Sequence, residues 1–169
     1  GLAGNEEVVS EGKDYDTFKE ALHYVNERLA KNLVRDGEGA TKLMECVVDH
    51  APTEAVAKSV ALSVINSSLL KAAIFAADAN WGRILCAIGY AEGDFDISKV
   101  EVVLSSSKGS VKVCENGAGV DFSEDEAFKI LSEDEIVIRI DMHDGADKSV
   151  AWGCDLTYEY VKINAEYRS

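Results

Sequence analysis

The stretch KLMECVVDH, residues 42–50, decides the fold class because its side chains alternate as they do in a β-strand. Met44, Cys46 and Val48 share one face, and the residues between them share the other. A period of two residues with at least one apolar face is typical of a strand within a sheet. Pro52 ends the run. The sequence therefore predicts a strand here, with helices on either side of it in the chain.

The helix before this strand is predicted from Tyr15 to the Asp36-Gly37 pair, where glycine tolerates a left-handed cap. Asp14 or Asp16 can cap its first amides. Its apolar residues recur at helical spacing and are Phe18, Leu22, Val25, Leu29 and Leu33.

The helices after the strand are also marked by their ends. Thr53 begins one whose apolar side runs to Ile65, and Ser67-Ser68 indicates a pause. Another is expected after Asp78, from Trp81 to Tyr90, and its small or apolar residues predict that it is buried.

The second half of the chain has strand patterns. Residues 100–104 and 110–116 are expected to form a hairpin, and a short helix capped by Ser123 follows them. DEIVIRIDM (134–142) and SVAWGCDL (149–156) are predicted to pair across the turn HDGADK. A terminal helix is expected over the last residues, with Thr157 as a candidate cap. We therefore expect one α/β (α+β) domain over residues 1–169: a layered mixed sheet with packed helices, helices mainly first and β-hairpins second.

Composition excludes several classes of protein. The chain has 169 residues, 47% of them apolar, and a formal charge of −14 from 17 basic and 31 acidic residues. Nucleic acid and anionic membranes are poor partners for such a surface. The apolar stretches are too short for a membrane span, and the first residues lack signal-peptide features. We expect a cytoplasmic protein.

Metal and cysteine chemistry has little support in the sequence. Cys46, Cys86, Cys114 and Cys154 lie far apart without a CxxC pair, so we predict free thiols and no metal, with Cys46 and Cys114 packed in the core. The segment DMHDGADKSVAW, residues 141–152, fails as a calcium loop because its glycine is at position five and position twelve is tryptophan. We interpret it as an exposed turn.

Two further stretches are candidate sites. In DGEGATK, residues 36–42, Glu38 lies between two glycines, and the loop lacks the Gly-Lys-Ser/Thr run of a phosphate cradle. A carboxylate there would attract an ammonium group, although a helix end and turn also explain the pattern. In ADANWGRIL, capping by Asp78, packing of Trp81 and pairing of Arg83 with an acid explain the residues, with ligand contact as the alternative.

Three blocks resemble a known family: LVRDGEGATKL, LLKAAIFAADANWGRIL and DLTYEYVKINAEYRS. Their order and approximate spacing are similar to those of the ornithine acetyltransferase or glutamate N-acetyltransferase family of arginine biosynthesis, ArgJ. The resemblance implies an ArgJ/DmpA-like fold. It also implies a precursor that cuts itself before a threonine and so gives an α chain and a β chain. The threonine freed at the start of the β chain becomes the nucleophile. Acetyl then passes from N2-acetyl-L-ornithine to L-glutamate through an acetyl-threonine, beside an oxyanion hole of the α chain.

Three substrate contacts follow from the resemblance: Glu38, Asn164 and Ser169. A carboxylate suits the ammonium of ornithine, and an amide and a hydroxyl suit a substrate carboxylate or amide. Without the resemblance, Asn164 and Ser169 would be interpreted as a frayed C-terminus. The resemblance implies no metal and no bound cofactor, with acetyl-CoA as a candidate second donor.

The sequence also departs from the family pattern. None of its threonines lies in the Gly-Thr-Met-Leu context where the family cuts, and Ala72 and Ala79 replace a usual Thr and Pro. We therefore expect the C-terminal part of the β chain, without the nucleophile or the α chain. Its expected partners are the α chain and the front of the β chain, in an α/β hetero-oligomer. The competing hypothesis is a stand-alone, non-catalytic amino-acid-binding or assembly module.

Overall fold

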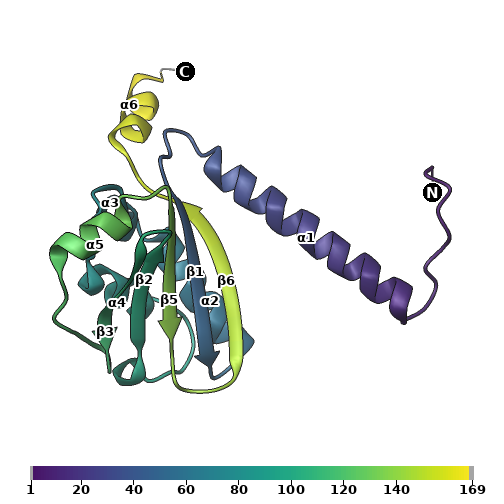
Figure 1. Ribbon diagram of the computed structural model, residues 1–169, viewed down its shortest axis with the longest axis horizontal. Helices are drawn as coiled ribbons and strands as arrows, with labels where there is room; N and C mark the ends of the chain where they lie inside the picture. The colour runs from purple at the N-terminus through teal and green to yellow at the C-terminus, as the bar shows by residue number, and fades with distance from the viewer. Residues whose placement is uncertain (1, 168–169) are drawn as a thin grey trace.

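The computed structural model describes residues 2–167 as a mixed sheet with helices against it (Figure 1). The strands are β1 (Leu43–Ala51), β2 (Glu101–Ser106), β3 (Gly109–Glu115), β4 (Ala118–Gly119), β5 (Glu135–Asp141) and β6 (Asp147–Cys154). The helices are α1 (Lys13–Arg35), α2 (Glu54–Asn66), α3 (Ser68–Phe75), α4 (Trp81–Gly89), α5 (Glu124–Leu131) and α6 (Tyr158–Glu166), with a 3-10 turn, η1 (Ile97–Lys99). The predicted mixed α/β fold is confirmed.

The sheet has the strand order β4-β3-β2-β5-β1-β6. The predicted hairpin of β2 and β3 is confirmed, but the predicted pairing of β5 with β6 is wrong. The strand β1 lies between them, parallel to β5 and antiparallel to β6. The two strand patterns are adjacent in the sequence and suggested a hairpin. Instead β1, whose residues Met44, Cys46 and Val48 are buried, takes an internal position in the sheet, where both of its edges are paired.

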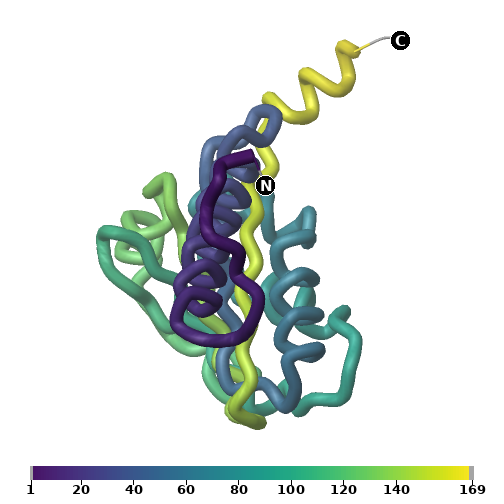
Figure 2. Tube along the Cα trace, turned by 90° about the vertical axis from the view of Figure 1, so that its right-hand side faces the viewer, coloured from purple at the N-terminus to yellow at the C-terminus, as the bar shows by residue number. Residues whose placement is uncertain are grey.

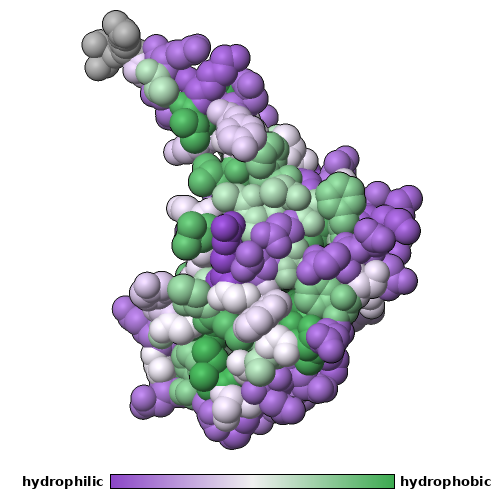
Figure 3. All heavy atoms as spheres, turned by 90° about the vertical axis from the view of Figure 1, so that its left-hand side faces the viewer, coloured by the Kyte–Doolittle hydropathy of each residue, from purple (hydrophilic) through white to green (hydrophobic). Residues whose placement is uncertain are grey.

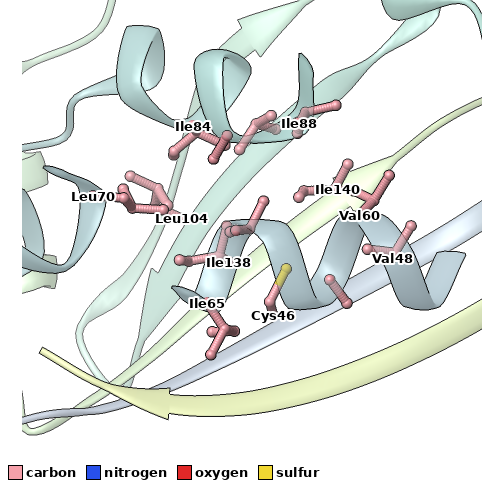
Figure 4. Packing of buried hydrophobic residues seen from close by; sticks show 14 of the residues in the cluster. Cys46, Val48, Val60, Ile65, Leu70, Ile84, Ile88, Leu104, Ile138 and Ile140 are labelled. Atoms are coloured by element: carbon pink, nitrogen blue, oxygen red, sulfur yellow. The ribbon is translucent and has the colours of Figure 1, made fainter. Parts of the chain in front are cut away.

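The core lies between the sheet and the helices α2, α3 and α4. The residues Met44, Cys46 and Val48 of β1 are fully buried, as their alternation predicts. In Figure 4, Cys46, Leu104 and Ile138 from three strands point into the same apolar layer as side chains of α2 and α4. The helix α5 contacts β2 and β3. Burial of this layer is the main favourable term for folding.

Helix starts agree only partly with the expected caps. Thr53, Ser123 and Thr157 accept the amides predicted for them. The expected cap of α1 by Asp14 or Asp16 is wrong, since Gly12 is the N-cap and has no side chain to accept a hydrogen bond. Those two acids instead lie in the first turn, where a negative charge favours the helix dipole.

The prediction that α4 is buried is wrong for one of its faces. Asn80, not Asp78, caps α4, and the Asp78 carboxylate accepts a hydrogen bond from the Asn80 amide. Trp81 is 39% exposed and Tyr90 is 80% exposed, while Ile84 and Ile88 are buried. The helix lies at the surface of the core layer, so only one side of it is covered.

The long helix α1 extends from the body, and α6 projects from one end of it (Figures 1 and 2). Only the last turns of α1 approach the sheet, where Lys31 pairs with Glu45 at 2.9 Å and Arg35 pairs with Glu135. Among residues 2–167, no single helix is long and apolar enough to cross a membrane, and the pair α2 and α3 passes that test only together, with a 58° bend.

Candidate functional site

The Glu38 turn lies between the end of α1 and the start of β1. Gly39 has a φ of 68°, and a Cβ at this position would stand 2.7 Å from the backbone nitrogen of Tyr160. Glycine is therefore required both by the backbone conformation and by the close approach of α6. The turn presents the Glu38 side chain at the exposed end of the sheet.

The structure brings Asn164 of α6 to the Glu38 turn. The Asn164 Nδ2 donates to Glu38 Oε2 at 2.7 Å and to the Tyr160 carbonyl at 2.9 Å. Both partners are acceptors, so the side of the amide that faces them must be the NH2 group. Its two protons are then used, and the Oδ1 of Asn164 remains an acceptor.

This pair is exposed. Glu38 and Asn164 both lie on the surface. A cavity of about 410 Å³ at the same end of the sheet is lined by Ser106, Ser107, Val137 and residues 132–135, so neither of the pair lines it. The third predicted contact, Ser169, lies outside the described residues.

A buried carboxylate joins the Glu38 turn to the segment before α6. Asp155 is only 3% exposed, and its Oδ1 accepts hydrogen bonds from the amides of Thr41, at 2.8 Å, and Lys42, at 3.0 Å. Its Oδ2 accepts from the Thr41 hydroxyl. The negative charge of Asp155 is thus compensated by donors from the segment that follows Glu38.

A buried hydroxyl makes a second connection. Thr157 is 4% exposed, and its Oγ1 donates to the Gly39 carbonyl at 2.7 Å while accepting the Tyr160 amide at 3.2 Å. Within residues 2–167, Asp155 and Thr157 are the two buried polar residues. Sequence reasoning assigned Thr157 only a capping role and did not single out Asp155. The acid immediately after an apolar strand was the signal available for it.

The side chain of Lys42, directly before β1, is partly buried. Its Nζ donates to the Leu131 carbonyl at the end of α5. Burial lowers the pKa of Lys42, while the negative charges of Asp155 and Asp134 act in the opposite direction. The ammonium therefore ties α5 to the start of β1.

The other stretches considered from sequence lie elsewhere. In ADANWGRIL, the predicted pairing of Arg83 with an acid is wrong, because its guanidinium donates to the Leu69 carbonyl at 2.8 Å. In the turn between β5 and β6, Asp141 contacts His50 Nδ1 at 2.8 Å and His143 Nδ1 at 3.3 Å. Among residues 2–167, no group of three or more His, Cys, Asp or Glu is arranged to hold a metal ion.

The four cysteines do not form a cluster at the Glu38 turn. All four are free, and Cys46 and Cys114 are packed in the core as predicted. Burial raises the pKa of the Cys46 thiol well above its ordinary value. A neutral thiol at this position acts as an apolar side chain.

The described site therefore defines an α/β protein with a small polar surface at one end of its sheet, formed by a glycine-flanked acid and an amide. The chain belongs to the ArgJ family, whose family model matches residues 2–169. It is 50% identical over 169 residues to the arginine biosynthesis bifunctional protein ArgJ 1 of Clostridium acetobutylicum, covering 100% of this chain and 41% of that protein. It is also 50% identical over its full length to the ArgJ protein of Caldanaerobacter subterraneus subsp. tengcongensis, of which it covers 42%.

A solved relative has the same fold. The crystal structure of the arginine biosynthesis bifunctional protein ArgJ of Bacillus halodurans superposes with a TM-score of 0.90 at 42% identity, covering 98% of this chain and 76% of that one. The chain thus spans about two fifths of the length of the curated relatives that it matches. More than half of each of those relatives lies outside the matched part.

Proposed function

We propose that this chain is part of a bifunctional acetyltransferase of arginine biosynthesis. The complete protein would move acetyl from N2-acetyl-L-ornithine, with acetyl-CoA as a candidate second donor, to L-glutamate. The reaction would pass through an acetyl-threonine whose threonine lies outside these 169 residues. Family membership and the bifunctional arginine-biosynthesis names of the relatives support this proposal.

The 2.7 Å hydrogen bond between Asn164 and Glu38 is the observation that carries the local assignment. Both protons of the Asn164 NH2 group are used in its two hydrogen bonds, so the Asn164 Oδ1 and the Glu38 carboxylate are left as acceptors on two residues that contact each other. An ammonium group has three donors and a positive charge, so it complements this pair. We therefore assign Glu38 and the Oδ1 of Asn164 to an ammonium group of the ornithine-type substrate.

The exposed position of this pair supports a site completed by other residues. Glu38 and Asn164 are open to solvent, whereas small-molecule sites usually enclose most of their ligand. In the complete protein the remaining walls would come from the α chain and the front of the β chain. Ser169, the third residue implied by the family resemblance, belongs to the same proposal.

The apolar side of α1 supports the same partners. All residues of α1 are described and none of them is buried. Its exposed apolar side chains include Phe18 at 58%, Leu29 at 54% and Leu33 at 76%. The relatives contain more than half of their length outside the matched part, which is enough protein to cover this helix. A second copy is a poorer occupant because each chain carries a formal charge of −14.

Steady-state kinetics of the complete protein test the substrate assignment. Glu38→Ala is expected to raise KM for N2-acetyl-L-ornithine by roughly 10- to 100-fold, because a charge-assisted hydrogen bond is lost. The melting temperature should stay within a few degrees, since the side chain is exposed. Glu92→Ala, which removes another exposed acid, is the matched control and should leave KM unchanged.

The opposite result would identify Glu38 as a turn residue only. Equal losses of activity and thermal stability in Glu38→Ala, or an unchanged KM, would contradict the ammonium assignment. Assay of the 169-residue chain alone is expected to give no acetyl transfer. Transfer by that chain would contradict the placement of the nucleophile outside it.

A further inference from the structure

The helix α6 reaches Glu38 without a fully buried apolar residue of its own. None of its residues, Tyr158–Glu166, is buried. In Figure 3 the segment at the top left, which corresponds to α6, projects from the body and is largely hydrophilic. Asn164 is the seventh residue of α6 and lies about 9 Å along the axis from the first. Its position at Glu38 therefore depends on how the first turn is held.

Asp155 and Thr157 hold that first turn through buried polar contacts. Three donors of Thr41 and Lys42 converge on the Asp155 carboxylate, and the Asp155 amide donates back to the Lys42 carbonyl at 3.3 Å. Among residues 2–167, every buried side-chain nitrogen and oxygen has a hydrogen-bond partner. A buried carboxylate is costly unless it is compensated in this way, so its contacts fix the relative position of the two segments.

Thr157 fixes the direction in which α6 leaves the sheet. Its hydroxyl connects the Gly39 carbonyl, next to Glu38, with the Tyr160 amide in the first turn of α6. Tyr160 in turn offers its carbonyl to the Asn164 amide. A continuous chain of hydrogen bonds therefore runs from the Glu38 turn through Thr157 and Tyr160 to Asn164, and returns to Glu38.

We infer that Asp155 and Thr157 are positioning residues, which set the separation of Glu38 and Asn164 and thereby the affinity for the substrate's ammonium group. This inference rests on the proposed function for its kinetic consequence, but not for its geometric one. Neither residue touches the substrate; both act through Glu38 and Asn164. The edge contact of Tyr158 with Phe75, at 5.5 Å between ring centroids, also supports α6 but does not involve the Glu38 turn.

A spectroscopic experiment on the 169-residue chain tests the geometry. In Thr157→Val, which keeps the side-chain shape and removes the hydroxyl, the NMR signal of the Asn164 side-chain amide should move to the position of a solvent-exposed amide. Thr157→Ser should restore the original signal. Thr53→Val removes the capping hydroxyl of α2, which accepts the Val56 amide at 3.2 Å, and is the matched control that should not move the signal.

Asp155→Asn tests the buried carboxylate in the same way. The variant keeps the shape but replaces one acceptor oxygen by an NH2 group, so the Asn164 signal should move in the same direction as in Thr157→Val. If Asp155→Asn does not fold, the Thr157 pair decides alone. An Asn164 signal that stays in place in Thr157→Val would overturn the inference.

Kinetics of the complete protein then test the consequence. Thr157→Val is expected to raise KM for N2-acetyl-L-ornithine about tenfold or more with kcat within threefold, and Thr157→Ser and Thr53→Val should retain the original KM. A moved Asn164 signal with unchanged KM would overturn the positioning role. Absence of acetyl transfer in the unsubstituted complete protein would refute the proposed function, while the NMR result would still decide the geometry.

Discussion

The helices α1 and α2 have the same kind of sequence signal and opposite surroundings. Both carry apolar residues at helical spacing. In α2, six residues are buried against the sheet and α4, whereas none is buried in the 23 residues of α1. The difference teaches that periodicity specifies a helix and the presence of an apolar side, but not the surface that covers that side.

The two helices also differ in the contacts that attach them to the sheet. The helix α2 is held by apolar burial along its whole length (Figure 4). The helix α1 is held near its end by polar contacts, in which Lys31 bridges Glu27 and Glu45 and lies 5.4 Å from the centre of the Trp152 ring. We therefore expect substitutions in α2 to affect folding of this chain, and substitutions in α1 to affect it much less.

The largest expected effect is that of Ile65→Ala in α2. Ile65 is 5% exposed, and its Cγ2 would be 2.3 Å from a Cβ placed on Gly153 of β6, so the side chain fills the space that this glycine leaves. Truncation should lower the free energy of unfolding by about 2–5 kcal/mol through lost burial and a cavity. Urea denaturation measures it.

Leu62→Ala on the exposed side of α2 is the control. Leu62 is 43% exposed, so its truncation should cost much less than that of Ile65. Similar losses for the two variants would mean that the core is not where the structure places it.

Much of this architecture could be predicted from the sequence, because alternation and helical spacing are local signals. The strand around Met44 and the caps at Thr53 and Thr157 are such cases. The insertion of β1 between β5 and β6 could not be predicted, since strand order depends on contacts between segments that are far apart in the sequence, such as Leu43 with Glu135 and with Cys154.

The candidate site shows the same limit. Family resemblance singled out Glu38 and Asn164, and the structure brings them within 2.7 Å of each other. Sequence pattern offered only a weak signal for Asp155, an acid directly after an apolar strand, and acids are rarely buried, so its burial was not expected. The cap signal at Thr157 was local, but its bond to Gly39 spans 118 residues of sequence.

An intermediate effect is expected for Glu45→Gln, which weakens the attachment of α1. Burial disfavours the charged form of Glu45, but hydrogen bonds from Lys31 and Trp152 outweigh it, so the pKa of this carboxyl is lowered. The group thus stabilises the fold above its unfolded pKa, and this contribution is lost as the pH falls through the lower, folded pKa. Glu45→Gln should cost about 1 kcal/mol at pH 7.

The pH dependence separates this effect from a change in packing. The difference in unfolding free energy between the original chain and Glu45→Gln should shrink as the pH is lowered below about 4, where the unfolded carboxyl also binds a proton. Chemical denaturation at several pH values measures the difference. A constant difference from pH 7 to pH 3 would contradict an electrostatic origin.

The smallest effect in the 169-residue chain is expected for Leu22→Ala in α1. Leu22 is 47% exposed, and alanine has a slightly higher helix propensity than leucine, so the free energy of unfolding should change by less than about 0.5 kcal/mol. The same substitution in the complete protein should cost more, about 1–3 kcal/mol, if other parts of that protein cover α1. Denaturation of both forms with the same variant makes the comparison. Equal small changes in the two would show that the apolar side of α1 remains exposed after assembly, and would remove the support that this helix gives to the proposed partners.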